Sequence, residues 1–130
     1  MPPIPDMQLD PARLAVLDRI ARQHRATTTG LNDRLHGLRD KSNDTLARLA
    51  HLEGRTVSDP HIYAAPQIAE LRTEAAGLAA QISEAEAEVE ASADAAASAR
   101  INLRSALELA EAENLPIPVG IDMEDARRAR

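Results

Sequence analysis

Apolar residues recur every seven positions, with a second set three positions later, along two long stretches of the chain. Sustained heptads of this kind are typical of helices that bury one stripe against another helix. We call the residues at these positions the seam. In the first stretch they are Leu14, Ala21, Thr28, Leu35, Ser42 and Leu49 with Leu17, His24, Leu31, Leu38, Thr45 and Leu52. In the second they are Ile68, Ala75, Ile82, Val89, Ala96, Leu103 and Ala110 with Leu71, Leu78, Ala85, Ser92, Ala99 and Ala106.

The composition agrees with helices that pack through aliphatic side chains. Tyr63 is the only aromatic residue, whereas a globular core of ordinary density usually contains several rings. Alanine, leucine, glutamate and arginine dominate the two stretches, and these residues lead the helix-propensity ranking. The predicted fold class is all-α: a long antiparallel two-helix coiled-coil hairpin with extended, proline-rich N- and C-terminal arms.

The first helix is bounded by an acidic residue and a glycine. Residues 1–10 hold three prolines, which have a fixed φ and no N–H, so they predict an extended N-terminal arm. Asp10 is the expected N-cap, and Pro11 the first helical residue. The helix is predicted over about 11–53, and Gly54 is its expected C-cap.

The remaining boundaries are set by prolines. A connection is predicted over 54–66, with a short helical turn of its own at 61–64. The second helix is predicted over about 67–114, so that the hairpin occupies 11–114, because two prolines at 116 and 118 cannot continue a helix. Residues 115–130 form the predicted C-terminal arm, which has room for a short helix from Asp122.

Seam and charges select one antiparallel register. If the hairpin folds about residue 60, the numbers of facing residues sum to about 120. This register places Leu17 against Leu103, Leu14 against Ala106 and Thr28 against Ser92. His24 becomes a half-buried residue that marks the register and bonds Thr28 or Ser92. The charged pairs expected beside the seam are Arg34 with Glu88, Arg48 with Glu74, and Asp18 with Arg100.

Several apolar residues lie off the seam, where a lone hairpin would meet water. A second copy or a docked larger partner would explain them. They are Val16, Ile20, Leu46, Ile101, Leu107 and Leu109.

Reactive and ligand-binding groups are sparse. The chain has no cysteine, so disulfides and thiolate chemistry are excluded. The four histidines include no pair at the spacing that places two metal ligands on one helix face. Alternating glutamates at 84, 86, 88 and 90 fan around a helix, and no nucleophile turn or glycine-rich phosphate loop is present. We expect no enzymatic activity, no metal, no cofactor and no small-molecule substrate.

The net charge of −6 argues against nucleic acid as the main partner. The first residues lack the basic and apolar regions of a signal peptide, and no stretch has the roughly 20 apolar residues of a membrane span. We therefore expect a chain that is made in the cytoplasm, does not bind membranes, and then enters an assembled particle.

The two arms are the predicted partner-binding segments. Both leave the predicted hairpin at the same end, and each carries a Pro-Ile-Pro sequence that stiffens an apolar strand. Such arms would grip copies of the same chain or a larger assembly. The expected contact residues are Pro3, Ile4, Pro5 and Met7 in the N-terminal arm and Pro116, Ile117, Pro118, Met123, Arg127 and Arg128 in the C-terminal arm.

These features predict a structural protein of a large complex, with a bacteriophage virion or tail-like particle as the first choice. A cytosolic coiled-coil adaptor, assembly chaperone or scaffold is the alternative. The alternative would fold alone, whereas the arms of a virion subunit would become ordered only in the particle. Helical-hairpin substrates of type VII secretion systems are a third class, but their Trp-x-Gly turn requires a tryptophan, which this chain lacks.

Overall fold

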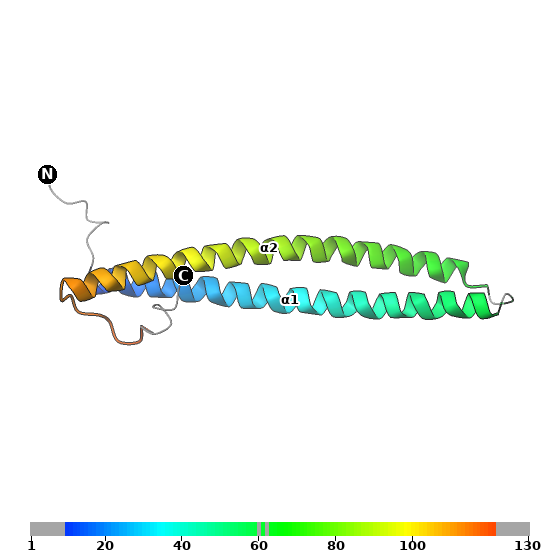
Figure 1. Ribbon diagram of the computed structural model, residues 1–130, viewed down its shortest axis with the longest axis horizontal. Coiled ribbons are helices and arrows are strands. Elements are labelled where there is room, and N and C mark those ends of the chain that lie inside the picture. The colour runs from blue at the N-terminus through cyan, green and yellow to red at the C-terminus, as the bar shows by residue number, and fades with distance from the viewer. Residues whose placement is uncertain (1–9, 60, 62, 122–130) are drawn as a thin grey trace. The chain divides into compact units, whose positions relative to one another are not determined.

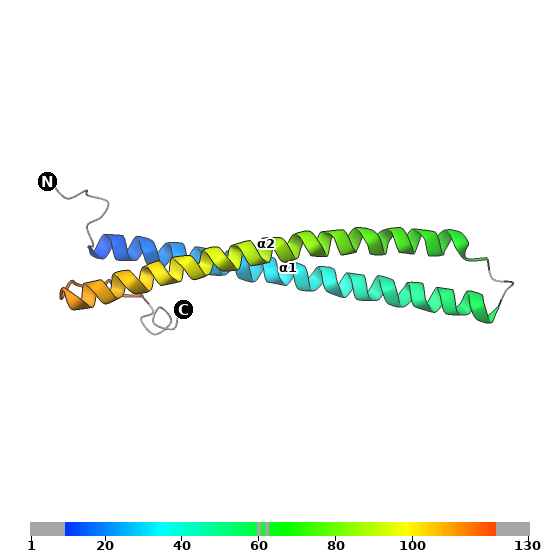
Figure 2. The ribbon, with the colours of Figure 1, turned by 45° about the horizontal axis from the view of Figure 1, so that its top comes forward.

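The computed structural model describes residues 10–59, 61 and 63–121. Over this range its regular structure consists of two helices, α1 (Pro11–Ser58) and α2 (Ala65–Ala112), which pack against each other (Figure 1 and Figure 2). The predicted all-α class is confirmed. The chain divides into two compact units, which are Met1–Thr29 with Glu90–Arg130 (unit 1) and Gly30–Val89 (unit 2).

The start of α1 follows the prediction. The amide of Arg13 donates to Oδ1 of Asp10 at 2.7 Å, and the amide of Leu14 donates to the Asp10 carbonyl at 3.1 Å. Asp10 is therefore the N-cap, and Pro11 occupies the first helical position, where the missing N–H has no helical acceptor to lose. The cap satisfies donors that would otherwise have no partner in the helix.

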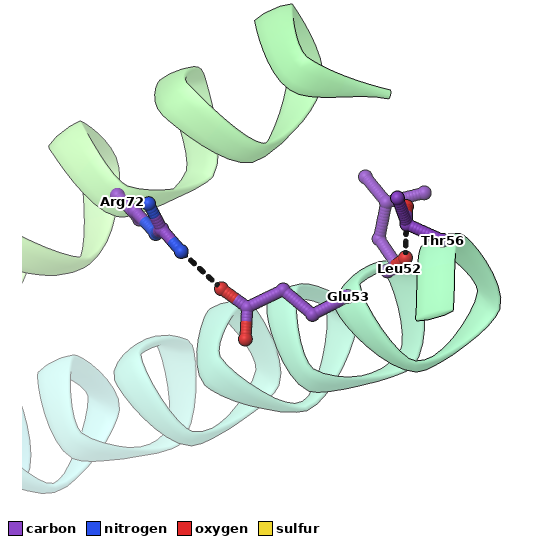
Figure 3. A network of polar contacts seen from close by, with 4 residues as sticks. All are labelled: Leu52, Glu53, Thr56 and Arg72. Atoms are coloured by element: carbon purple, nitrogen blue, oxygen red, sulfur yellow. Dashed lines mark hydrogen bonds and ion pairs between the residues drawn. The ribbon is translucent and has the colours of Figure 1, made fainter. Parts of the chain in front are cut away.

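The connection between the helices is shorter than predicted. Helix α1 continues through Gly54 to Ser58, so the assignment of Gly54 as a C-cap is wrong. A glycine ends a helix when it adopts a positive φ, and Gly54 does not. In the added turn the hydroxyl of Thr56 donates to the Leu52 carbonyl at 2.9 Å (Figure 3).

Of the predicted helical turn at 61–64 the structure describes residues 61, 63 and 64, and none of these is helical. The carboxylate of Asp59 accepts a hydrogen bond from the His61 amide at 3.0 Å, as in an Asx turn. Tyr63 and Ala64 have no regular structure. Helix α2 then begins at Ala65, where the Ile68 amide donates to the Ala64 carbonyl at 2.9 Å.

Helix α2 ends at Ala112, before the predicted boundary at 114. The amide of Leu115 donates to the Ala110 carbonyl at 2.8 Å, and the amide of Asn114 to that of Glu111 at 3.3 Å. Asn114 has a φ of 57°, a left-handed conformation that asparagine tolerates better than most residues. This Schellman turn closes the helix before the prolines at 116 and 118 are reached.

The burial pattern confirms the predicted seam, because every seam residue is buried or half-buried. In unit 1 the buried set, which we call the unit 1 cluster, contains Leu14 and Leu103, and their predicted layer partners Ala106 and Leu17 are half-buried and pack against it. In unit 2 the corresponding unit 2 cluster contains Leu35 with Ala85. Members of the unit 1 cluster are Leu14, Ala21, Ala99, Leu103, Leu107 and Ala110, with Leu17 and Ala106 at its edge. Members of the unit 2 cluster are Leu35, Leu38, Leu78 and Ala85, with Ile82 and Val89 at its edge.

In the contacts between the helices, higher residue numbers on α1 pair with lower residue numbers on α2. In unit 2, Arg34 contacts Glu88 at 3.5 Å, as predicted. Farther along α1 the partner on α2 has a lower number, since Glu53 contacts Arg72 at 2.8 Å (Figure 3). Both pairs lie at heptad positions that flank the seam.

Two predicted ion pairs do not form. Arg48 pairs with Asp44 at 3.1 Å instead of with Glu74. Asp18 likewise pairs with Arg22 at 3.1 Å instead of with Arg100. In both cases the partner is one turn away on the same helix, where the two side chains meet without spanning the seam.

Candidate partner-binding surfaces

Residues 115–121, here the C-terminal segment, add a third layer to unit 1. The side chains of Leu115, Ile117 and Ile121 pack against the unit 1 cluster. The guanidinium of Arg22 on α1 donates a hydrogen bond to the Gly120 carbonyl. The predicted exposure of Leu107 is wrong, because this residue belongs to the cluster that the segment contacts and is only 3% exposed.

The structure places only part of the predicted partner-binding set. Pro116 is exposed, Pro118 is half-buried, and Ile117 lies against the chain's own unit 1 cluster. The role of these residues in holding a partner stays a prediction. Outside the described residues lie Pro3, Ile4, Pro5, Met7, Met123, Arg127 and Arg128, together with the short helix expected from Asp122.

A groove runs along unit 1 beside the seam. Ile20 lies in it with 39% of its surface exposed, and the small side chains of α2 opposite leave the space open. Leu109, which is seven residues after Asn102, occupies the same heptad position as Asn102 and is 48% exposed. We call this feature the unit 1 groove; it is lined by Leu17, Ile20 and His24 of α1 and Ala95, Ser98, Ala99 and Asn102 of α2.

One layer of the unit 1 seam is polar. The hydroxyl of Thr28 donates to the His24 carbonyl at 2.9 Å. A hydroxyl has one hydrogen, so the 2.7 Å contact between Thr28 and Ser92 requires Ser92 to be the donor. His24 is half-buried and bonds Thr28 as predicted, but through its backbone carbonyl and not its ring.

Two exposed apolar side chains, one at the end of α1 and one in the connection, are candidate partner contacts that sequence reasoning missed. Val57 is 85% exposed and Tyr63 is 82% exposed. We name Val57 and Tyr63 the connection surface. A depression on the last turns of α1 lies close to it in sequence, lined by Ala50, His51, Gly54, Arg55, Ser58 and Asp59. The available signal was that the one aromatic residue of the chain falls outside both heptad repeats, next to turn residues.

Within the described ranges, no group of three His, Asp or Glu side chains is placed to hold a metal ion. His36 contacts Asp40 at 3.6 Å on the next turn of α1, on an exposed face. Neither of the described helices is long and apolar enough to cross a membrane.

Comparison with known proteins yields no relative: the chain matches no protein family, no curated protein sequence and no solved structure. Three features of the molecule bear on its function: the C-terminal segment, the unit 1 groove and the connection surface.

Proposed function

We propose that this chain is a non-enzymatic structural and assembly protein of a larger complex. Its long antiparallel two-helix coiled-coil hairpin would present surfaces to other protein chains, and its proline-rich arms would fasten it to them. A bacteriophage virion or tail-like particle is the assembly that we propose. The chain would be made in the cytoplasm and then enter that particle.

Tyr63 is the observation that carries this proposal. It is the only aromatic side chain in the sequence and is 82% exposed, and Val57, six residues earlier, is 85% exposed. An aromatic ring contributes more apolar area than any other side chain, yet the core does not use it. Tyrosine is enriched among the residues that dominate protein–protein binding energy, so its exposure supports a protein-binding surface at the connection.

The arrangement of the helices supports the coiled-coil part of the proposal. The seam residues are buried at heptad positions, and ion pairs such as Arg39 with Glu86 at 3.3 Å flank them. Charged residues beside a heptad seam set the pairing and orientation of coiled-coil helices.

A cytosolic adaptor or assembly chaperone is the second candidate, and the C-terminal segment favours it. Leu115, Ile117 and Ile121 pack on the chain's own helices, so this part of the arm has a docking site without any partner. An adaptor that is folded by itself requires such self-contained packing, whereas a subunit that folds on its particle does not.

Sedimentation of a lysate from the native cells separates the two candidates. A structural component should move with a large particle through a high-salt wash, at a constant ratio to the main protein of that particle. Tyr63→Ser should shift the chain to slowly sedimenting fractions. Ala47→Ser, which alters an exposed residue of α1 outside the connection surface, is the control and should stay with the particle.

Two outcomes would contradict the proposal. A wild-type chain found only in slowly sedimenting fractions would favour the adaptor. A Tyr63→Ser chain that stays with the particle like the wild type would remove the connection surface as the contact. Circular dichroism of each purified variant should show the same helix content as the wild type, because an exposed side chain contributes little to folding.

A further inference from the structure

We propose that the unit 1 groove is the interface with a second copy of this chain, in which α1 of one copy packs on α2 of the other. This inference rests on the proposed function and deepens it, since it names one partner and one surface. It concerns unit 1 alone. Three observations support it: the loss of charge along the groove, the opposite charge of its two helices, and the cover on the other side of the seam.

Charge is lost along the groove at one heptad position. In unit 2, this position on α1 is occupied by Arg34, Lys41 and Arg48. Seven-residue steps back along α1 lead to Thr27 and Ile20 in unit 1, and a third step leads to Arg13 near the start of the helix. Residues at such steps lie on the same face of a helix, so this face of α1 is uncharged only between Arg34 and Arg13, where Ile20 lines the groove.

Helix α2 shows the same change. Its matching position carries Glu74, Gln81 and Glu88 in unit 2. Along unit 1 it carries Ala95, Asn102 and Leu109, of which Ala95 and Asn102 line the groove. Ile20, Ala95 and Asn102 thus line the groove without a charge, and a face that only met water would have no reason to lack charges there.

The other side of the unit 1 seam is already covered. There, Arg22 bonds Gly120 and Ile117 packs against the unit 1 cluster. The groove side has Ile20 and Leu109 exposed at 39% and 48%. Unit 1 therefore has one side closed by its own chain and one apolar side open to a partner.

Charge identifies the partner as a second copy. Residues 11–29 of α1 carry four arginines and one aspartate, whereas residues 90–112 of α2 carry four acidic residues and two arginines. A partner of uniform charge would be attracted by one helix and repelled by the other. A second copy related by a two-fold axis can place α1 on α2 twice, so that opposite charges meet at both contacts.

The same charges exclude the other symmetric arrangement. Packing α1 on α1 would oppose arginines to arginines beside the groove, where Arg13 and Arg19 are exposed. Packing α1 on α2 instead brings this basic edge to the acidic edge of the other copy, which carries Asp94 and Glu108.

Sedimentation equilibrium of the full chain tests the interface. The wild type should dimerise between about 1 μM and about 500 μM, the range expected for a modest apolar contact. Ile20→Asp should raise the dissociation constant at least about tenfold, because it places a charge at the centre of the contact. Ala47→Asp introduces the same charge at an exposed position of unit 2 and should leave the dissociation constant unchanged.

A charge-swap experiment tests the orientation. Arg13→Glu with Arg19→Glu makes the α1 edge acidic, and Asp94→Lys with Glu108→Lys makes the α2 edge basic. Each double variant should lose self-association, and an equal mixture of the two should recover it as a heterodimer. Glu108 also contacts Arg104 of its own helix at 3.1 Å, so the recovery on mixing, and not the loss alone, establishes the orientation.

The possible failures are distinct. A wild type that stays monomeric over this range, or an Ile20→Asp variant that associates as the wild type does, would overturn the interface. So would charge variants that each dimerise alone. If instead the dimer forms as expected but the chain fails to sediment with a particle, the proposed function is overturned and the interface stands.

Discussion

Units 1 and 2 are built from the same two helices but hold them together differently. In unit 1 the cluster gains a third layer, because Leu115, Ile117 and Ile121 of the C-terminal segment pack against it. In unit 2 the described members of the cluster come from α1 and α2 alone, and ion pairs such as Arg34 with Glu88 lie beside it. The comparison indicates that a narrow apolar stripe can be supplemented either by another segment of chain or by flanking charges.

The largest difference should appear when one leucine of each cluster is truncated. Leu14 in unit 1 is fully buried, whereas Leu38 in unit 2 retains 9% of its exposure. Leu14→Ala should lower the free energy of unfolding by about 3 kcal/mol, and Leu38→Ala by about 2 kcal/mol, since a cavity under a third layer collapses less easily. Urea unfolding followed by circular dichroism measures both.

Leu46→Ala is the control for that comparison, because this exposed leucine of α1 contributes little buried area. If the Leu38→Ala variant were destabilised more than the Leu14→Ala variant, the third layer would not be strengthening unit 1.

The next effect should come from loosening the third layer itself. Ile117→Ser removes half-buried apolar area from the contact with the unit 1 cluster and should cost about 1 kcal/mol. Hydrogen exchange should then accelerate at the amides around Leu107 in unit 1 and stay unchanged in unit 2. Val119→Ser, in the same segment but fully exposed, should change neither region.

A uniform acceleration across both units would contradict this prediction. It would mean that Ile117 stabilises the whole chain and not the third layer of one unit.

The seam and the N-cap could be predicted because they depend on local spacing. Heptad positions are fixed by helix geometry, so the burial of Leu14, Leu38 and Leu103 follows from the sequence alone. Asp10 before Pro11 is a cap for an equally local reason, since its carboxylate reaches the amide three residues later.

The ends of the helices at the connection could not be predicted in the same way. Gly54 is permissive, and whether it ends a helix depends on what the next turn offers. Here α1 continues past it to Ser58, and Asp59 then forms its Asx turn with His61. Hydrogen bonds from a side chain to the backbone, such as this one, compete with the backbone hydrogen bonds of a helix and are nearly as favourable.

The sequence did not predict the exposure of side chains that are covered by, or lie opposite, residues far away in the sequence. Leu107 looks exposed on a two-helix wheel and is buried because residues 115–121 complete unit 1. The unit 1 groove was likewise not foreseen as a groove, since it depends on the small side chains of Ala95 and Ser98 lying opposite Ile20. The composition of the chain and the spacing of its apolar residues do not show which side chains of α1 and α2 lie opposite each other.

A smaller effect is expected at the polar layer of unit 1. Ser92→Ala removes the donor to Thr28 and should cost about 1 kcal/mol, whereas Thr28→Val with Ser92→Ala should cost less than that single change. The double change replaces both hydroxyls by apolar groups and leaves no unpaired acceptor. Urea unfolding of the two single variants and the double variant, as a double-mutant cycle, measures the coupling.

If the double variant lost as much stability as the two single variants combined, Thr28 and Ser92 would act independently. The 2.7 Å contact would then contribute nothing to holding unit 1 together.

The smallest effect should come from the ion pairs of unit 2, and its salt dependence distinguishes the two units. Arg39 and Glu86 are 3.3 Å apart and about half exposed, so Arg39→Gln should cost only about 0.2–0.5 kcal/mol at low ionic strength. At about 1 M salt the Debye length falls to about 3 Å, and the difference between variant and wild type should vanish. The loss caused by Leu14→Ala, which removes apolar packing in unit 1, should persist at that salt concentration. A cost of Arg39→Gln that survives high salt would show that the aliphatic part of the arginine packs over the seam, so that unit 2 too depends on apolar cover.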